Sequence, residues 1–295
     1  MKEIAVALGG GGARGNVHIG VLRALEEAGY QIAAIAGTSF GGLVAALYAA
    51  GYSPDEIESI FDEIDQSKLY ELGLHNKPAV LGLSKISQWL DQMLGEKSFD
   101  ETRIPCAMTA ANLLCNCEVT LKTGALKNAI LATIAVPGIF PPYQTNDHYL
   151  IDGGVLNPVP VSLARELTPD LPVVAVALTQ PLSPSSSYHL PVSIPSVIPE
   201  SIVKRITRLN VAQAMNVFLQ SVDMSNRAIT ELRLKNEPPD ILIRPDVEGI
   251  GLLDQVDVPT LARLGEEATK IILPDLARVM HRSRGFFNIL FRRKK

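Results

Sequence analysis

The chain has 295 residues, of which 47% are hydrophobic and 20% charged, a balance typical of a compact globular protein with a sizeable core. Its formal net charge of −4 gives no reason to expect a nucleic-acid partner. Aromatic residues make up only 5% of the chain, while Ala, Leu, Ile and Val are plentiful. This composition favours helices packed on a buried parallel sheet.

The first fifty residues predict a strand, a helix, a second strand and a second helix. Residues 3–8 form an apolar run that ends in four glycines, which indicates a strand feeding a loop. Apolar residues at helical spacing predict a helix over residues 17–28, closed by Gly29. Residues 32–36 predict another strand, and residues 41–50 an Ala- and Leu-rich helix. This order is a βαβ unit, so we expect a parallel sheet.

An uncharged stretch at residues 31–52 is long enough to span a bilayer. It nevertheless contains three glycines and the adjacent polar pair Thr38 and Ser39, which favours a strand, a turn and a helix buried in a soluble fold. The chain enters its first strand at once, without the features of a signal peptide. We therefore expect a cytoplasmic protein.

The rest of the chain predicts further strands and helices in one continuous unit. We expect strands at 104–112, 118–122, 148–151, 173–178 and 241–243, and helices over most of 54–100 and over 124–134, 202–234 and 260–280. Residues 181–199 are rich in Ser and Pro and indicate an irregular exposed flap. No repeat or interdomain linker is evident, so we expect one domain over residues 1–281.

A basic and apolar tail follows at residues 282–295. Residues 276–295 carry seven Lys or Arg and no acid. Two interpretations stay open, a solvated terminus or a peripheral contact with an anionic membrane surface. The second interpretation joins the basic residues to the neighbouring apolar ones, Phe286, Phe287, Ile289, Leu290 and Phe291.

The three cysteines are Cys106, Cys115 and Cys117. An odd number with one Cys-Asn-Cys pair does not predict a disulfide framework. The spacing is also poor for zinc, and no histidine cluster lies nearby. We expect buried reduced thiols, no bound metal and no cofactor.

A glycine-rich loop, Gly10-Gly11-Gly12-Ala13-Arg14-Gly15, follows the first predicted strand and opens a helix. A dinucleotide site would need an acidic residue at the end of the next strand, where residues 35–38 have none. A P-loop would need Gly-Lys-Ser or Gly-Lys-Thr, which is missing here. The unpaired N–H groups of such a loop can instead stabilise an oxyanion. Arg14 can brace the loop or add positive charge.

The motif Gly37-Thr38-Ser39-Phe40-Gly41 has the G-x-S-x-G spacing of a nucleophile elbow. In such an elbow the serine lies on a sharp turn between a strand and a helix, and small neighbours permit close approach. The predicted strand before and helix after Ser39 fit that context. A plain helix N-cap is the alternative role for Ser39.

A serine nucleophile needs a base. Asp152 follows a predicted strand, and Gly153 and Gly154 let other backbone approach it. A partly desolvated carboxylate in a cleft acts as a base when its pKa is raised. A turn aspartate is the alternative for Asp152, and a triad through His189 is the alternative for the base. His189 lies within the flap and His281 beside the tail, which are poor places for a rigidly oriented histidine.

Together these motifs resemble the patatin-like phospholipases, particularly their short bacterial type. The resemblance extends to Ala135-Val136-Pro137-Gly138-Ile139-Phe140-Pro141-Pro142, Asn157-Pro158 and Arg244-Pro245-Asp246. It covers nearly all of residues 3–275 and is weakest over residues 181–199 and after Arg282.

The resemblance implies a three-layer α/β/α patatin-like fold with a mostly parallel central sheet, and hydrolysis of lipid esters without a metal. It implies that Ser39 is the nucleophile and Asp152 its base partner, with no histidine. The oxyanion hole would be formed by the loop residues Gly10, Gly11, Gly12, Arg14 and Gly15. Gly37, Gly41, Gly153 and Gly154 would support the two catalytic turns. The partner would be a lipid or another acyl ester; the alternative function is a non-catalytic lipid-binding or regulatory protein that retains the fold.

Overall fold

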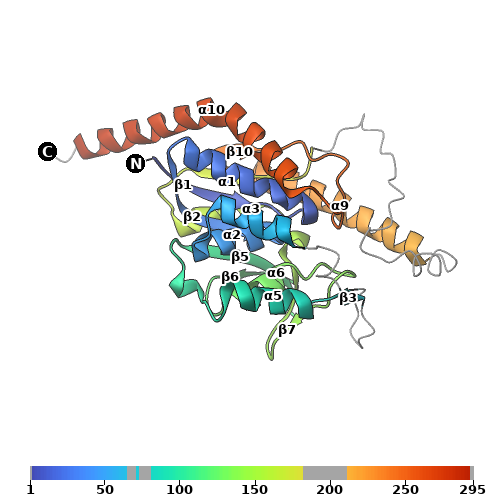
Figure 1. Cartoon of the computed structure of the whole chain (residues 1–295). Coiled ribbons are helices and arrows are strands. Elements are labelled where there is room, and N and C mark those ends of the chain that lie inside the picture. The colour runs from blue at the N-terminus through green and yellow to red at the C-terminus, as the bar shows by residue number, and fades with distance from the viewer. Residues whose placement is uncertain (1, 65–70, 73–80, 182–210, 293–295) are drawn as a thin grey trace.

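The computed structural model describes residues 2–64, 71–72, 81–181 and 211–292, and its centre is a twisted eight-stranded sheet (Figure 1). The strand order is β10-β9-β1-β2-β5-β8-β7, and β6 pairs with β5 beside this path. The strands are β1 (Lys2–Leu8), β2 (Tyr30–Thr38), β5 (Cys106–Asn112), β6 (Cys117–Leu121), β7 (Tyr143–Gln144), β8 (Tyr149–Asp152), β9 (Val173–Val176) and β10 (Ile241–Ile243).

The central sheet is mostly parallel, as the sequence predicts. Strands β10, β9, β1, β2 and β5 run parallel to one another. The other three strands, β6, β7 and β8, add antiparallel pairs at the β5 side. The predicted strand, turn and helix over residues 31–52 are confirmed as β2 followed by α2 (Phe40–Ala50).

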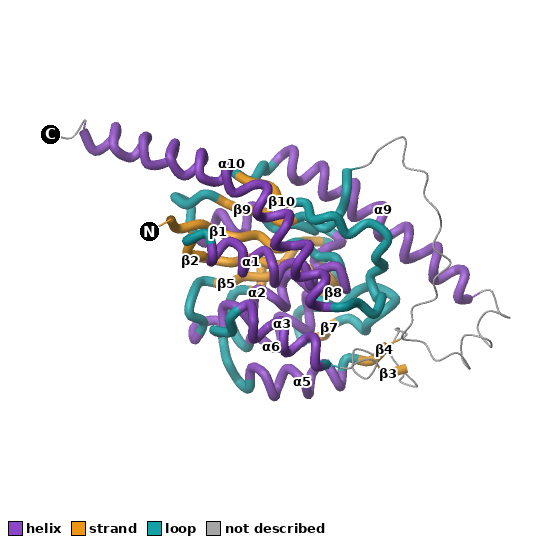
Figure 2. Tube along the Cα trace, turned by 45° about the horizontal axis from the view of Figure 1, so that its top comes forward, coloured by secondary structure: helices purple, strands orange, loops and turns teal. Residues whose placement is uncertain are grey.

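Side-chain alternation along β1 explains the three layers. Ile4, Val6 and Leu8 point into the larger core cluster, whereas Ala5 and Ala7 point into a second cluster on the opposite face. The larger core lies beneath α1 (Val17–Glu27), α2, α3 (Pro54–Glu63), α5 (Ser84–Leu94), α6 (Leu126–Thr133) and part of α10 (Val258–Arg292). The second cluster is covered by α7 (Val161–Leu167) and the end of α9 (Val211–Asn236). In Figure 2 the strands accordingly form an inner layer between helices.

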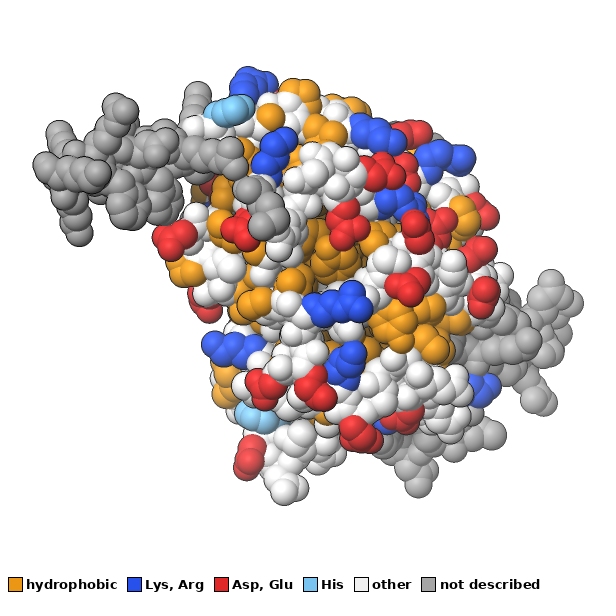
Figure 3. Space-filling model, turned by 60° about the vertical axis from the view of Figure 1, so that its left-hand side comes forward, with side chains coloured by type: hydrophobic (Ala, Val, Ile, Leu, Met, Phe, Trp, Pro, Cys, Tyr) orange, Lys and Arg blue, Asp and Glu red, His pale blue; other side chains and the backbone are white. Residues whose placement is uncertain are grey.

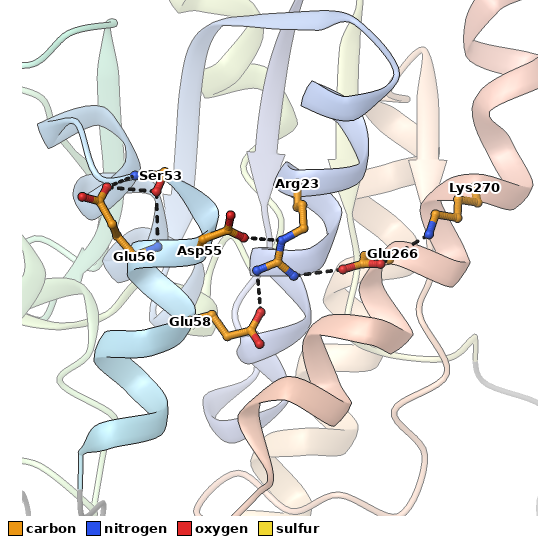
Figure 4. Close-up of polar contacts among 7 residues, drawn as sticks. All are labelled: Arg23, Ser53, Asp55, Glu56, Glu58, Glu266 and Lys270. Carbon is orange, nitrogen blue, oxygen red and sulfur yellow. Dashed lines mark hydrogen bonds and ion pairs between the residues drawn. The ribbon is translucent and has the colours of Figure 1, made fainter.

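Arg23 ties three of these helices together. Its guanidinium, on α1, donates to Asp55 and Glu58 of α3 at 2.7 and 2.5 Å and to Glu266 of α10 at 2.9 Å (Figure 4). Three carboxylates around one cation form a network, which is worth more than an isolated surface pair.

Two sequence-based predictions differ clearly from the structure. Between residues 54 and 100 the helices α3 and α5 are separate, and the two-residue strands β3 (Glu71–Leu72) and β4 (Leu81–Gly82) pair between them. Helix α10 continues past the predicted end at residue 280 to Arg292, through Pro274. The predicted flap at residues 182–199 and the start of the predicted helix at 202–210 lie outside the described residues, as do the side chains of the tail after His281.

The prediction for the cysteines is wrong for two of the three. Cys115 and Cys117 are exposed and joined by a disulfide in the turn between β5 and β6. Cys106, at the start of β5, is buried and free as predicted. The spacing argument failed because the turn between two antiparallel strands brings the Cα atoms of Cys115 and Cys117 within 5.3 Å of each other.

On the described part of the face in Figure 3, acidic and basic side chains are interspersed around apolar strips. None of the helices within the described ranges is long and apolar enough to cross a bilayer. The same part of the chain contains no cluster of His, Cys, Asp or Glu side chains arranged to hold a metal ion.

Candidate active site

Ser39 lies on the sharp turn between β2 and α2. Its backbone has φ 55° and ψ −127°, a region that non-glycine residues rarely adopt and that occurs mostly where surrounding structure imposes it. Glycine is needed on both sides because a Cβ on Gly37 would lie 2.4 Å from Gly41 O, and a Cβ on Gly41 would lie 2.4 Å from Leu8 O. The motif therefore forms a strained turn packed directly against the end of β1.

Asp152 is the last residue of β8, and its carboxylate faces Ser39. Ser39 Oγ donates to Asp152 Oδ2 at 2.5 Å, and the N–H of Gly154 donates to Asp152 Oδ1 at 2.7 Å. Ser39 is 7% exposed and Asp152 is 5% exposed. The structure thus brings the two predicted residues into one short, buried hydrogen bond across 113 positions of the chain.

The edge of β5 explains how these two residues meet. Strand β6 pairs along one edge of β5 from Met108 to Asn112, so β2 and β8 must share the other edge. Thr38 pairs with Thr109, and Asp152 pairs with the next residue, Ala110. Because β2 and β8 run in opposite directions relative to β5, their carboxyl ends point toward each other. Ser39 and Asp152 are the residues at that junction.

Three buried threonines support the junction. Thr133 Oγ1 accepts the N–H of Ser39 at 2.8 Å and donates to Thr109 O at 2.7 Å. Thr38 Oγ1 donates to Asn157 O at 2.8 Å and lies 2.9 Å from Thr109 Oγ1. Thr38 belongs to the serine motif, but Thr109 and Thr133 were missed by sequence reasoning because they belong to no motif. The one local signal is a threonine within the otherwise Ala-rich strand β5.

Burial raises the pKa of Asp152 from its ordinary value of 3.8 to about 6. The hydrogen bonds from Ser39 and Gly154 act in the opposite direction but do not cancel the burial. A carboxylate with this pKa is largely ionised at neutral pH and is still basic enough to accept a proton in a reaction.

The glycine-rich loop packs directly beside Ser39. A Cβ on Gly10 would lie 3.2 Å from Ser39 Cβ, which is tighter than an ordinary contact, so a side chain here would press on the nucleophile. The N–H of Gly10 donates to Pro158 O and the N–H of Ala13 to Leu252 O, both at 2.9 Å. Gly11 and Gly12, at the start of the short 3-10 helix η1 (Gly12–Asn16), have N–H groups without an acceptor among the described residues.

Arg14 braces this loop. Its Nε donates to Ile250 O at 2.6 Å, and its Nη1 pairs with Asp223 of α9 at 2.9 Å. Arg227, one turn further along α9, pairs with the other oxygen of Asp223 at 2.9 Å. The Arg14 guanidinium is therefore engaged with protein groups. The next residue, Gly15, packs against the ring of Phe40, and a Cβ on Gly15 would lie 2.3 Å from Phe40 Cδ1.

His18 is a buried residue that the sequence did not single out. Its Nε2 lies 2.7 Å from Gly9 O, and because a carbonyl can only accept, Nε2 carries the proton. Its Nδ1 has no hydrogen-bond partner. Burial lowers the pKa of His18 to about 4, against the opposing effect of the Gly9 bond, so the ring is neutral at neutral pH. It supports the start of the loop, at Gly9, as an uncharged hydrogen-bond donor.

No other histidine approaches Ser39 within the described residues. His148 and His281 are exposed. His189, the candidate for a triad, and His75 lie outside the described residues.

A cavity of about 150 Å³ opens over the pair and is lined by both Ser39 and Asp152. Gly10, Gly11, Gly12 and Arg14 line the same cavity. It thus brings together a hydroxyl, a carboxylate, unpaired amide protons and an open space beside them. Two other segments quoted in the sequence also contribute: Gly153 follows Asp152, and Pro137 belongs to the segment at residues 135–142. Gly153 packs on Thr109, where a Cβ would lie 2.1 Å from Oγ1, and Pro137 lines the cavity.

The sequence profile of the patatin-like phospholipases matches residues 6–165, which is more than half of the chain and includes all three motifs. The chain therefore belongs to the patatin-like phospholipase family. Among solved structures, VipD from Legionella pneumophila has a TM-score of 0.54 and 11% identity, over 96% of this chain and 67% of VipD. This likeness concerns the fold, and it agrees with the predicted patatin-like architecture.

Curated relatives share parts of their length with this chain. The uncharacterized NTE family protein Rv1063c of Mycobacterium tuberculosis is 36% identical over 179 residues, covering 60% of this chain and 49% of the relative. The uncharacterized NTE family protein Rv2565 is 27% identical over 94% of this chain and 48% of its own length. Mouse patatin-like phospholipase domain-containing protein 6 is 32% identical over 56% of this chain and 13% of its own length. The chain thus spans about half the length of the mycobacterial relatives and a much smaller share of the mouse protein.

Proposed function

We propose that this chain is a serine hydrolase of lipid acyl esters, with Ser39 as the nucleophile and Asp152 as its base. The observation that carries the proposal is the 2.5 Å hydrogen bond from Ser39 Oγ to Asp152 Oδ2 at the floor of a cavity. Membership of the patatin-like phospholipase family supports a lipid substrate.

In the first half of the reaction, Ser39 Oγ attacks the ester carbonyl carbon while its proton passes to Asp152 Oδ2. The carbonyl oxygen becomes an oxyanion, which the N–H groups of Gly11 and Gly12 stabilise. The C–O bond to the alcohol then breaks, and protonated Asp152 returns its proton to the leaving oxygen. The products of this half are an acyl-serine and a free alcohol.

In the second half, a water molecule replaces the alcohol. The water oxygen attacks the acyl carbon while Asp152 takes a proton from the water, and the N–H groups of Gly11 and Gly12 hold the second oxyanion. The bond to Ser39 Oγ breaks, and the proton returns from Asp152 to Ser39. A carboxylic acid leaves, and the site has regained its starting state.

The roles of the remaining motif residues follow from their contacts. Because the N–H of Gly10 is donated to Pro158 O, Gly10 acts by allowing the loop to lie against Ser39 rather than as a donor to the oxyanion. Arg14 holds the loop between Ile250 and α9. Gly15 keeps it close to Phe40, at the start of α2.

The test is hydrolysis of p-nitrophenyl acyl esters by wild-type, Ser39→Ala and Asp152→Ala proteins, with labelling by a fluorophosphonate probe. We expect both variants to lose turnover and Ser39→Ala to lose labelling. Hydrolysis by Ser39→Ala at the wild-type rate would refute the assignment. Wild-type protein that binds lipid but neither hydrolyses esters nor reacts with the probe would instead support the alternative, a non-catalytic binding or regulatory protein.

A further inference from the structure

Two chemically different groups of residues, here called walls, line the cavity beside Ser39. One wall is apolar and comes from α2, α3, α5 and the turn before β7; its members include Leu43, Phe61, Ile86, Trp89, Ile139 and Phe140. The other wall is mixed and comes from the glycine-rich loop, α9 and residues 252–254; it includes the polar side chains of Arg14, Asn16, Asp223, Asn226 and Asp254 and the apolar side chains of Val222, Leu252 and Leu253. Ser39 follows β2 and directly precedes α2, so Phe40 and the apolar wall begin next to it.

A row of aromatic rings leads away from the nucleophile along the apolar wall. Phe40 directly follows Ser39, and its ring centroid lies 5.3 Å from that of Phe61 on α3. The Phe61 ring in turn lies 5.9 Å from the ring of Trp89 on α5. Both pairs are tilted, with interplanar angles of 38° and 34°. The row therefore extends an apolar surface from the reacting atom to α5.

The charged groups of the mixed wall are unsuited to contact with a hydrocarbon chain. Asp223 is paired with both Arg14 and Arg227, and Asp254 Oδ2 accepts the N–H of Gly251 at 2.7 Å. Covering these groups with methylenes would remove their remaining contact with water without providing new partners, which is costly. A glycerol or head-group portion with hydroxyl or ester oxygens can instead form hydrogen bonds there.

We propose that the acyl chain of the substrate lies along the row from Phe40 through Phe61 to Trp89, and that the alcohol portion faces α9. The inference rests on the proposed function for the identity of the scissile bond. Phe61 and Trp89 are then specificity-determining residues for chain length, and the enzyme prefers medium or long acyl chains to acetyl or butyryl esters. Each methylene that the row buries raises kcat/KM about fourfold.

Trp89 also provides a readout that needs no catalysis, because it is the single tryptophan of the chain. Ser39→Ala protein is titrated with sodium dodecanoate below its micelle concentration, with butyrate as the short-chain control. We expect a saturable change in Trp89 emission with dodecanoate and none with butyrate at the same concentration. Binding of dodecanoate seen by calorimetry without any change in Trp89 emission would overturn the proposed path of the chain.

The kinetic test compares p-nitrophenyl esters from butyrate to dodecanoate in wild type, Trp89→Ala, Trp89→Phe and Asn226→Ala, the last of which alters the mixed wall. We expect Trp89→Ala to lose at least tenfold of the dodecanoate-to-butyrate preference, Trp89→Phe to keep most of it, and Asn226→Ala to keep it in full. Thermal unfolding verifies that each variant is folded. If Trp89→Ala and Trp89→Phe both keep the wild-type preference, the inference is wrong. If wild type hydrolyses no ester at all, the proposed function fails, and the fluorescence titration still decides where the chain binds.

Discussion

Thr133 accepts the backbone N–H of Ser39 at 2.8 Å, and its own hydroxyl proton is donated to Thr109 O. Through this single side chain, the last residue of α6 holds the strained turn at the end of β2. The N–H of Ser39 is buried, so an acceptor at this place is required for the turn to keep its geometry.

Replacing Thr133 with Val should therefore weaken both the fold and the reaction. Valine has almost the same shape but leaves the Ser39 N–H and Thr109 O without this partner, at a cost of about 1–3 kcal/mol in the free energy of unfolding. We expect a lower Tm and slower labelling of Ser39 by a fluorophosphonate. Thr133→Ser, which keeps the hydroxyl, should restore both; failure of this rescue would argue against the hydrogen bond as the cause.

Asp152 should impose a pH limit on the reaction. Only its ionised form accepts the serine proton, and burial raises its pKa to about 6. We expect kcat/KM for a soluble p-nitrophenyl ester to fall about tenfold per pH unit below that value. Rates that stay constant from pH 7 down to pH 5 would contradict Asp152 as the base.

The same raised pKa predicts that Asp152→Asn is more stable than wild type at neutral pH. The folded protein binds the Asp152 proton more tightly than the unfolded chain does. The stability that this proton adds is therefore fully present below about pH 4 and is lost as the pH rises through about 6. Asparagine carries no charge and escapes the loss, which is on the order of 2–3 kcal/mol. Thermal unfolding at pH 7.5 and pH 4 should show a higher Tm for the variant only at pH 7.5, together with lost turnover.

Gly12→Ala should abolish activity, whereas Gly29→Ala should not. Both glycines have positive φ, at 57° and 77°, so alanine strains the backbone in each case. A Cβ on Gly12 would also lie 2.1 Å from Leu252 O, whereas nothing lies within 4 Å of one on Gly29. We expect a rate loss of about 100- to 1000-fold for Gly12→Ala alone. Equal rates for both variants, at comparable loss of Tm, would remove Gly12 from the oxyanion site.

Asp223→Asn should slow turnover through Arg14 without altering the nucleophile. The change removes the charge that holds Arg14 Nη1 at 2.9 Å, so the glycine-rich loop loses part of its brace. Charge-assisted bonds contribute about 1.5–3 kcal/mol, which corresponds to a loss in kcat of about 10- to 100-fold if it is fully expressed. Asp223→Glu should recover part of the rate.

Glu58→Gln is the matched control, because it removes one of the three carboxylates that pair with Arg23, in a network that does not include Arg14 (Figure 4). We expect it to lower Tm slightly and to leave kcat unchanged. A similar loss of kcat in Glu58→Gln and Asp223→Asn would indicate general loosening of the fold rather than positioning of the loop.

Much of this site was readable from local sequence because it depends on local sterics. The Gly37-x-Ser39-x-Gly41 spacing predicts the sharp turn, since a Cβ on Gly37 would collide with Gly41 O and a Cβ on Gly41 with Leu8 O of β1. The glycine-rich loop after β1 and the Asp152-Gly153 turn are predictable for the same reason. The apolar run at residues 3–8 likewise predicts the strand that β1 forms.

Sequence reasoning failed where contacts cross the fold. No local pattern pairs Arg14 with Asp223, 209 positions away, or Ser39 with Thr133, because such contacts depend on the packing of α9 and α6. The error over Cys115 and Cys117 has a different origin: the two residues are only two positions apart, and the backbone of the turn between β5 and β6 brings their sulfurs together.

The residue types and their order along the chain specified a serine on a strained turn, a loop of unpaired amides and a carboxylate after a strand. Their meeting was decided by tertiary structure: β6 occupies one edge of β5, so β2 and β8 share the other and end against each other. Strand pairing across such distances is set by the packing of the whole sheet, because no local interaction connects Thr38 with Asp152 until β5 lies beside both.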